Sequence, residues 1–336
     1  IDGVLGGNYR RYDYDYSLIQ ASELTVPNFF HISNVSGSPT TDMFKQELEM
    51  NSVFGQANFS YKDYIFIGGT ARNDWSSTLP SDNWSYFYPS VNFGLIFTEL
   101  FDSGILSFGK VRASYAVVGN DTNPYQLSNT YGASGNTFNG VTQYFYNRGL
   151  ANANLRPEEK TSVEAGINLK FLNNRYGIDI TYYDEKTTDQ IMQADITSST
   201  GFNSQWINAG EIENEGVEIN AYADIFKSRN GFNWSINVNW AKNNNTVNEL
   251  EEGIDVYQIN SSWGGVTTEA RVGEPLGVIR ATGFVRDENN NIVVGSDGIP
   301  KATDGPINVG NFTPDWTGGI VNNFSYKGFN LSVSID

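Results

Sequence analysis

Strict alternation of apolar and polar residues is the feature that most constrains this chain. In segment 232–240 every second residue is large and apolar, and the residues between are asparagine or serine. The same period recurs in 163–171, 176–182 and 217–225. Because side chains along a β-strand point alternately to the two sides of a sheet, this period predicts strands with one apolar and one polar face. A weak helical pattern is confined to Asp42–Met50.

The connections between these strands are of two kinds. Short reversals rich in Asn, Gly, Asp and Lys, each flanked by aromatic residues, occur at 61–64, 171–176, 226–232 and 326–329. Long stretches rich in Asn, Ser, Thr and Gly occupy 72–84, 119–158, 186–205 and 242–315. A β-sandwich gives no reason for this sorting, whereas a transmembrane β-barrel has short turns at one end, long loops at the other and aromatic rings at the interfaces. We predict an all-β fold, an antiparallel transmembrane β-barrel, with about ten or eleven strands in this chain.

The barrel interpretation assigns a medium to each face. Strands can span a membrane only in a closed barrel, because an unpaired backbone group in lipid costs several kcal/mol. We therefore expect the tryptophan and phenylalanine residues of segment 232–240 to face lipid. Asn233, Ser235, Asn237 and Asn239 are then expected to line a wet interior.

Composition excludes several functions. The 336 residues include 21 Lys+Arg and 38 Asp+Glu, a formal net charge of −17, which argues against nucleic acid as a partner. The absence of cysteine excludes disulfides, thiolate metal sites and a cysteine nucleophile. The sequence contains no apolar run of about 20 residues, so it predicts no transmembrane helix. The first residues lack the apolar core of a signal peptide.

Catalytic motifs are poorly represented. The single histidine, His31, lies among aromatic residues and is expected to pack rather than to bind metal. Glu158–Glu159 and Glu251–Glu252 are adjacent pairs, whose side chains point to opposite faces of a strand. We find no nucleophile elbow and no phosphate-binding loop. We expect a protein that is not an enzyme, with no catalytic residue, no cofactor and no metal site.

One segment is similar to a calcium loop. Asp287, Asn289 and Asn291 have the 1-3-5 spacing of such a loop, but Ile292 and Gly298 stand where it requires Gly and Glu. We interpret the segment as a polar turn, with ion binding as the alternative.

Ligand contacts are predicted in the long loops. Trp75 and Trp84, with Asp74 and Asn83 beside them, supply the aromatic faces and hydrogen-bonding groups that a sugar ring needs. The residues favour the other interpretation, that both tryptophans only anchor their loop to the barrel rim. A second group has the same two interpretations, and Trp263, among small neighbours, could project from a mobile loop. The second group consists of Asp121, Asn123 and Tyr125.

Six segments, in order, resemble the TonB-dependent outer-membrane receptors, in particular the SusC/RagA branch. The Leu-x-Pro-Glu…Glu-x-Gly strand entry is matched by "NANLRPEEKTSVEAGINLKF", and the Asn-x-Gly…Gly-x-Glu strand by "NAGEIENEGVEINAYADIF". The late-barrel pair is similar to "VGEPLGVIRATGFVRD" and "VGNFTPDWTGGIVNNFSYKGFNLSVSID". Mid-barrel strands are similar to "RNDWSSTLPSDNWSYFYPSVNFGLIFTEL" and "LSFGKVRASYAVVGND". The resemblance extends from about Val53 onward.

The resemblance implies a bacterial outer-membrane importer with a barrel of about 22 strands. Residues 1–336 would form part of that barrel, without a plug domain and without the final strands. Such proteins take up bulky oligosaccharides or peptides together with a SusD-like surface lipoprotein, and TonB supplies energy through the plug. The Asp-rich stretch frequent in the family is replaced here by "VVGSDGIPKATDGPINVG". We expect strands of the same polypeptide or of a partner to cover both edges of this partial barrel in the lipid.

Two other functions stay open from the residues alone. A secreted, soluble β-protein that binds glycans would need no detergent. A passive porin would span the membrane but would lack the family's order of motifs.

Overall fold

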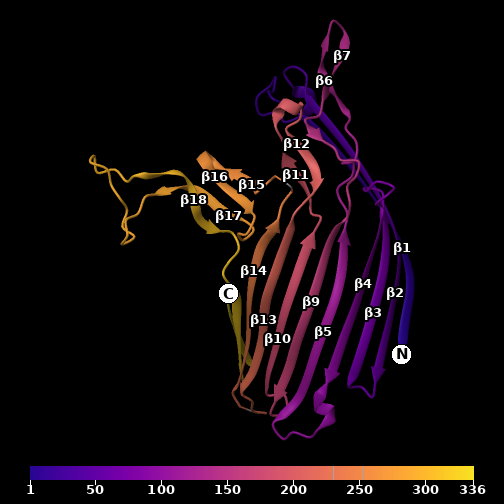
Figure 1. Ribbon diagram of the computed structural model, residues 1–336, viewed down its shortest axis with the longest axis vertical. Helices are drawn as coiled ribbons and strands as arrows, with labels where there is room; N and C mark the ends of the chain where they lie inside the picture. The colour runs from indigo at the N-terminus through magenta and orange to yellow at the C-terminus, as the bar shows by residue number, and fades with distance from the viewer. Residues whose placement is uncertain (230, 252) are drawn as a thin grey trace.

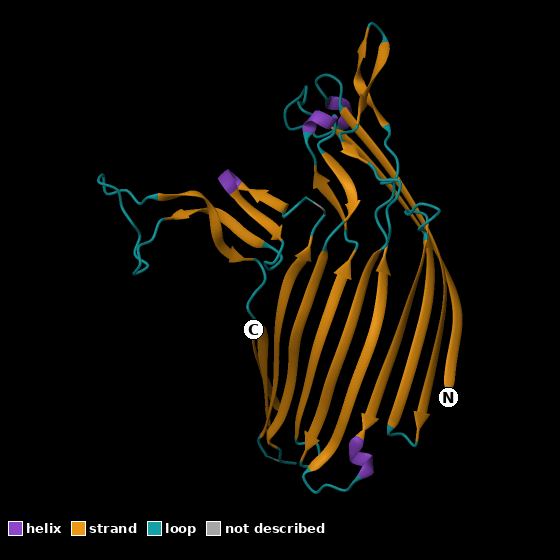
Figure 2. Ribbon diagram, in the orientation of Figure 1, coloured by secondary structure: helices purple, strands orange, loops and turns teal. Residues whose placement is uncertain are grey.

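One large antiparallel sheet dominates the computed structural model (Figures 1 and 2). The structure describes residues 1–229, 231–251 and 253–336, apart from the side chains of residues 135, 136 and 263. The sheet has eleven strands, which confirms the predicted all-β fold and partial barrel. In spatial order they are β1 (Asp2–Gln20), β2 (Thr40–Tyr61), β3 (Ile65–Ser76), β4 (Ser85–Ile96), β5 (Leu106–Asn120), β9 (Glu158–Phe171), β10 (Tyr176–Thr188), β13 (Glu211–Phe226), β14 (Asn233–Glu249), β19 (Thr317–Tyr326) and β20 (Phe329–Ile335).

The strands follow one another up and down, so that each pairs with its neighbour along the chain once the small strands of the loops are passed over. β1 and β20 form the two edges, and the described strands do not close the sheet on themselves. The described helices are the single 3₁₀ turns η1 (Ile32–Asn34), η2 (Phe97–Leu100), η3 (Ser198–Thr200) and η4 (Trp263–Gly265). None of the described helices is long and apolar enough to cross a membrane.

The weak helix expected at Asp42–Met50 is absent, and that prediction was wrong. This segment lies in β2 and pairs with β1 without a register shift, from Asp2 opposite Asn58 to Gln20 opposite Thr40. Nineteen consecutive cross-strand pairs outweigh a short helical pattern, because local propensity is a weak determinant beside long-range pairing.

The two faces of the sheet differ in chemistry from β5 to β14. Residues directly opposite each other share a face. The register therefore places Val111, Ile167, Ile180, Ile219 and Trp240 in one apolar row on the outer face. One residue further along each strand, a polar row lies on the inner face. Its members are Lys110, Asn168, Asp179, Asn220 and Asn239.

The apolar outer face is not packed against protein. Large outer-face side chains such as Val91, Phe93 and Val163 are 42–50% exposed. Trp234, Ile236 and Val238 are covered only in part by their neighbours, and none of them is buried. An exposed apolar band of this extent is a surface for lipid, as the sequence predicts.

The buried apolar side chains gather instead at the loop end of the strands. Three clusters form there, each tying strand ends to loops: Ile212 with Val247, Leu250 and Ala270; Leu79 with Tyr86 and Leu155; and Ala194 with Ile207 and Ala209. The layer above the barrel wall therefore has hydrophobic cores of its own.

The long connections contain small sheets rather than unstructured loops. β6 (Tyr131–Phe138) and β7 (Val141–Tyr146) form the tall hairpin at the top of Figure 1. β11 (Ile191–Asp195) and β12 (Ser204–Asn208) belong to the connection that follows β10 and precedes β13 in the sequence. They pair with each other, and β12 also pairs with β8 (Gly149–Leu150). The connection from β14 to β19 forms a four-stranded arm that projects sideways from the barrel wall (Figure 1). Its strands are β15 (Val256–Ser262), β16 (Val266–Arg271), β17 (Val278–Phe284) and β18 (Ala302–Asn311).

The short turns at the other end have the predicted aromatic flanks. Tyr61 and Tyr64 meet edge to face with ring centroids 5.8 Å apart. Phe226, Phe232, Trp234 and Phe324 form a cluster with centroids 5.8–6.1 Å apart. Lys62 and Asp63 both have positive φ, as do Lys327 and Gly328, which is the geometry of a two-residue hairpin turn whose twist matches the strands.

Candidate functional site: the inner wall and the loop layer

The inner face of the sheet is a hydrogen-bonded wall. Asn168 on β9 donates from Nδ2 to Oδ2 of Asp179 on β10 at 2.5 Å. Arg112 on β5 donates to the same carboxylate, from Nη1 to Oδ2 at 3.0 Å and from Nη2 to Oδ1 at 2.6 Å. Arg112 also donates to Oγ1 of Thr181. The wall therefore presents fixed amide and charged groups to whatever occupies the interior.

Arg112 reaches Asp179 by crossing an entire strand. Gly166 of β9 stands between Arg112 and Thr181 in the register. A Cβ at Gly166 would lie 2.7 Å from Cζ of Arg112, closer than non-bonded atoms tolerate. The absence of a side chain at Gly166 is therefore the condition for this contact. This explains the glycine of the Glu-x-Gly pattern.

Gly216, the glycine of the Gly-x-Glu pattern, likewise leaves room for a side chain to cross its strand. Tyr183 on β10 lies across Gly216 of β13, and its hydroxyl donates to Oδ1 of Asn243 on β14 at 3.1 Å. A Cβ at Gly216 would lie 2.4 Å from the tyrosine ring and 2.7 Å from the carbonyl oxygen of Lys242. Side chains that span three strands in this way stiffen the wall against sliding of its strands.

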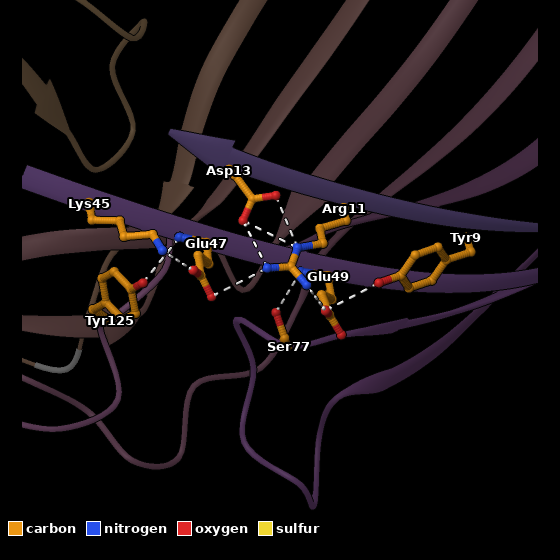
Figure 3. Close-up of polar contacts among 8 residues, drawn as sticks. All are labelled: Tyr9, Arg11, Asp13, Lys45, Glu47, Glu49, Ser77 and Tyr125. Atoms are coloured by element: carbon orange, nitrogen blue, oxygen red, sulfur yellow. Dashed lines mark hydrogen bonds and ion pairs between the residues drawn. The ribbon is translucent and has the colours of Figure 1, made fainter. Parts of the chain in front are cut away.

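The upper half of the β1–β2 hairpin rises beyond the end of β3 and carries different chemistry on its two faces. One face bears charged groups, drawn in Figure 3. Nε of Arg11 lies 3.0 Å from Asp13, and Nζ of Lys45 lies 2.6 Å from Glu47. The hydrogen bond from Arg11 lowers the pKa of Asp13. Exposed ion pairs of this kind add little stability, so we interpret the charged face of the hairpin as a hydrated surface.

The other face of the hairpin, which continues the inner face of the sheet, is aromatic. Tyr12 and Tyr14 stand side by side with nearly parallel rings, 6.5 Å apart, and Tyr14 also contacts Phe44 at 6.4 Å. Tyr12, Tyr14 and Tyr16 are 39–45% exposed. Sequence reasoning missed this surface, although the alternation in "YDYDYS" carried the signal.

Two loop residues hold the free side of β2 (Figure 3). The hydroxyl of Tyr125 accepts from the backbone N–H of Glu47 at 3.1 Å, and Oγ of Ser77 accepts from that of Glu49 at 2.9 Å. Tyr125, predicted as a ligand contact, therefore also anchors its loop to the hairpin. Its side chain remains 61% exposed.

Asp74, another predicted ligand contact, is 3% exposed, and its carboxylate is hydrogen-bonded to other side chains of the protein. Nε of Arg72 donates to Oδ1 of Asp74 at 2.8 Å, and the hydroxyl of Tyr88 donates to Oδ2. A buried carboxylate with these partners stabilises the top of the wall.

Asp121 and Asn83 tie loops together. Asp121 accepts from the hydroxyls of Ser76 and Thr78. Asn83 donates to the carbonyl oxygen of Leu155 at 3.2 Å. These contacts give both residues a structural role in the layer above the wall.

The remaining predicted contacts differ in accessibility. Trp75 is half-buried and pairs with Ser85 in the β3–β4 ladder. Trp84 is 48% exposed, and Asn123 is exposed as well, so both stay candidates for ligand contact. The backbone of Trp263 opens η4, and its side chain lies outside the described residues. Of the seven candidates whose side chains the structure describes, Asp74, Asn83, Asp121 and Tyr125 bond to other parts of the protein, while Trp84, Asn123 and Tyr125 are exposed.

Asp287 caps a turn in the arm. Its Oδ1 accepts from the backbone N–H groups of Asn289 and Asn291, and its Oδ2 accepts from Nδ2 of Asn291. Both carboxylate oxygens are thereby engaged within the turn, which favours the polar-turn interpretation. Among the described residues no group of three or more His, Cys, Asp or Glu is placed to hold a metal ion.

Fold and face chemistry together define the class: a stretch of outer-membrane β-barrel wall with an elaborate loop layer. The family profile described as "TonB dependent receptor-like, beta-barrel" matches residues 2–334, and the chain belongs to this family. Its resemblance is to the SusC/RagA branch, and its location is the bacterial outer membrane.

Named relatives agree with this placement. TonB-dependent receptor P26 of Formosa agariphila is 29% identical over 329 residues, covering 89% of this chain and 33% of the relative. TonB-dependent receptor SusC of Bacteroides thetaiotaomicron is 31% identical over 217 residues, covering 61% of this chain and 21% of the relative. A solved structure described as the RagAB peptide transporter superposes with a TM-score of 0.83 at 20% identity, covering 99% of this chain and 38% of that one. The chain spans about a third of the length of P26.

Proposed function

We propose that the intact protein imports a bulky nutrient, an oligosaccharide or a peptide, across the outer membrane. The observation that carries this proposal is the polar inner face that runs across the sheet opposite an exposed apolar face. Eleven strands are half of a barrel of about 22, a size class whose lumen is wide and plugged. Within this proposal, residues 1–336 are part of the barrel domain and the plug lies elsewhere in the polypeptide.

The proposed partners follow from the branch of the family. A SusD-like surface lipoprotein would close over the mouth, and TonB would act through the plug region. The name of the relative SusC and the description of RagAB as a peptide transporter support this assignment. The family consists of receptors rather than enzymes, and we propose a transport role without catalysis.

Substrate contacts are proposed on the loop layer and the inner wall. Tyr12, Tyr14 and Phe44 form the exposed aromatic surface that continues the inner face, and Trp84 and Asn123 are the accessible members of the predicted set. Aromatic faces bind the C–H surfaces of sugar rings or the side chains of peptides, while tyrosine hydroxyls supply hydrogen bonds.

Uptake by cells producing the full-length protein tests the proposal. Labelled oligosaccharides and peptides are supplied to a deletion strain, to the complemented strain and to a complemented strain without TonB. Import that requires both the protein and TonB is expected. Uptake that persists at full rate without TonB would identify a passive porin and overturn the importer assignment.

A further inference from the structure

Basic residues are concentrated on three neighbouring short turns of the barrel. The segments 171–176, 224–232 and 326–329 close the β9–β10, β13–β14 and β19–β20 hairpins, which lie next to one another in the sheet. They contain Arg175, Lys227, Arg229 and Lys327, against one acidic residue, Asp224. In a chain with a net charge of −17 this is a local reversal of sign. We call these four residues the basic rim.

Most of the charge of the basic rim is not neutralised by carboxylates. Lys227 lies 3.0 Å from Asp224. Arg175 donates to the backbone carbonyls of Asp224 and Ile225, which leaves its charge in place. In the part of the chain that the structure describes, no ion pair involves Arg175, Arg229 or Lys327.

Two of the four cations, Lys327 and Arg175, lie over tyrosine rings on the lipid side of the wall. Nζ of Lys327 lies 5.2 Å from the ring centroid of Tyr326, and Cζ of Arg175 lies 5.5 Å from that of Tyr176. Both tyrosines belong to the outer face by register, opposite Phe329 and Phe171. Lys62 repeats the arrangement over Tyr61 at 5.4 Å, although Asp63 follows it directly.

Exposed apolar side chains continue directly from these cations. Tyr326 is 48% exposed, Phe329 is 82% exposed and Phe226 is 54% exposed. The sequence of surfaces along the outer face is therefore an apolar band, an aromatic belt and then positive charge. This order matches the acyl chains, the interface and the headgroups of a phospholipid leaflet.

We propose that the basic rim binds the phosphate groups of anionic phospholipids in the leaflet at the short-turn end of the barrel. An ammonium or guanidinium group held over a tyrosine ring at the interface sits at headgroup depth, where anionic lipid is attracted to each basic residue. Binding of this kind concentrates anionic lipid beside three hairpins. The inference concerns the lipid contact and holds whether or not the protein is an importer.

The same end of the barrel provides an internal control. The turn between β4 and β5, residues 97–105, contains Glu99 and Asp102 and no basic residue. It faces the same leaflet, and its charges should attract no anionic lipid.

Fluorescence quenching of Trp234 by brominated lipids tests the proposal. Trp234 packs on Phe324 with ring centroids 5.8 Å apart and donates its indole N–H to Asn322 at 3.1 Å, so it reports on lipid beside the basic rim. The full-length protein is reconstituted in mixtures of brominated phosphatidylglycerol and phosphatidylcholine, and its Trp234→Phe variant supplies the background. We expect phosphatidylglycerol to be preferred about threefold or more near Trp234.

The triple variant Lys227→Gln, Arg229→Gln, Lys327→Gln is expected to lose that preference, whereas Glu99→Gln with Asp102→Asn keeps it. Lys327→Arg keeps it as well, because the charge is retained. In the unmodified protein the preference should weaken as salt is added. Equal quenching by the two lipids in the unmodified protein, or an unchanged preference in a correctly folded triple variant, overturns the proposal.

Discussion

The guanidinium of Arg112 on β5 binds the carboxylate of Asp179 on β10, two strands away, and it passes over Gly166 of the strand between them. Both charged side chains are partly shielded on the inner face, with 35% and 25% of their surfaces exposed. The pair connects three strands through one contact. Its existence depends on a position that has no side chain.

Gly166→Ala should destabilise the barrel by about 1–2 kcal/mol, because the new methyl group displaces Arg112 from Asp179. Thermal unfolding of the detergent-purified full-length protein, followed by the mobility shift of the unheated barrel on gels, measures the effect. Gly69→Ala is the matched control, since its nearest neighbour would be the carbonyl oxygen of Ser90 at 3.7 Å. If Gly166→Ala costs the same in an Arg112→Gln background, the cause is not the displaced guanidinium.

Gly216→Ala should be more damaging than Gly166→Ala, because a Cβ there meets backbone as well as a side chain. The ring of Tyr183 could move, but the carbonyl oxygen of Lys242 at 2.7 Å cannot move without shifting β14. Truncating the ring with Tyr183→Ala is therefore expected to rescue Gly216→Ala only in part. Tyr183→Phe alone removes one hydrogen bond and should cost about 0.5–1.5 kcal/mol. Full rescue by Tyr183→Ala would show that the backbone contact is unimportant.

The adjacent residues Ile219 and Asn220 should respond oppositely to arginine. Ile219→Arg places a charge on the lipid face, which costs about 2–4 kcal/mol near the bilayer midplane, and should reduce folded barrel in the membrane. Asn220→Arg places the same side chain on the inner wall beside Asp179 and should be tolerated. Quantifying correctly folded protein in outer-membrane fractions compares the two. Tolerance of both substitutions would contradict the assignment of the faces.

Tyr125→Phe should loosen the free side of the β1–β2 hairpin. Without the hydroxyl, the N–H of Glu47 loses its acceptor, and its hydrogen exchange should accelerate by up to about tenfold. Ser77→Ala should accelerate exchange at Glu49 instead, so each variant is the control for the other. An unchanged rate at Glu47 in Tyr125→Phe would remove this anchoring role.

The tip of the arm should lose order in acid. Hydrogen bonds from Asn291 lower the pKa of Asp287 in the folded turn. The stabilisation from this carboxylate is therefore complete above its unfolded pKa of about 3.9 and is lost as the pH falls through the lower, folded value.

Hydrogen exchange of segment 285–301, corrected for the intrinsic effect of pH, should reveal this loss in the unmodified protein. Asp287→Asn should have a similar, weaker turn with no such pH dependence. A turn that opens at the same pH in both proteins would assign the transition to another group.

The sequence was sufficient for the wall but not for the layer above it. The period of two in β9, β10, β13 and β14 encodes both the strands and their faces, because each face meets a uniform medium. The helical pattern of Asp42–Met50 misled for the same reason that the loop sheets were missed: both are decided by pairing with distant segments. Burial and pairing cannot be read from residue type, so the sequence does not reveal that Asp74 is 3% exposed or that the carboxylate of Asp121 accepts from two hydroxyls. The use of Gly166 depends on Arg112, 54 positions away in the numbering, and no local signal reveals it.

In the part of the chain that the structure describes, every buried apolar cluster lies in the loop layer. The loop layer and the barrel wall are therefore stabilised by different forces. The crown at the barrel mouth is held by the same exclusion of water that folds soluble domains, whereas the wall is held by backbone pairing in a medium without competing hydrogen bonds. Urea is therefore expected to unfold the crown while the wall stays folded, so the crown can change its conformation without opening the wall to the membrane.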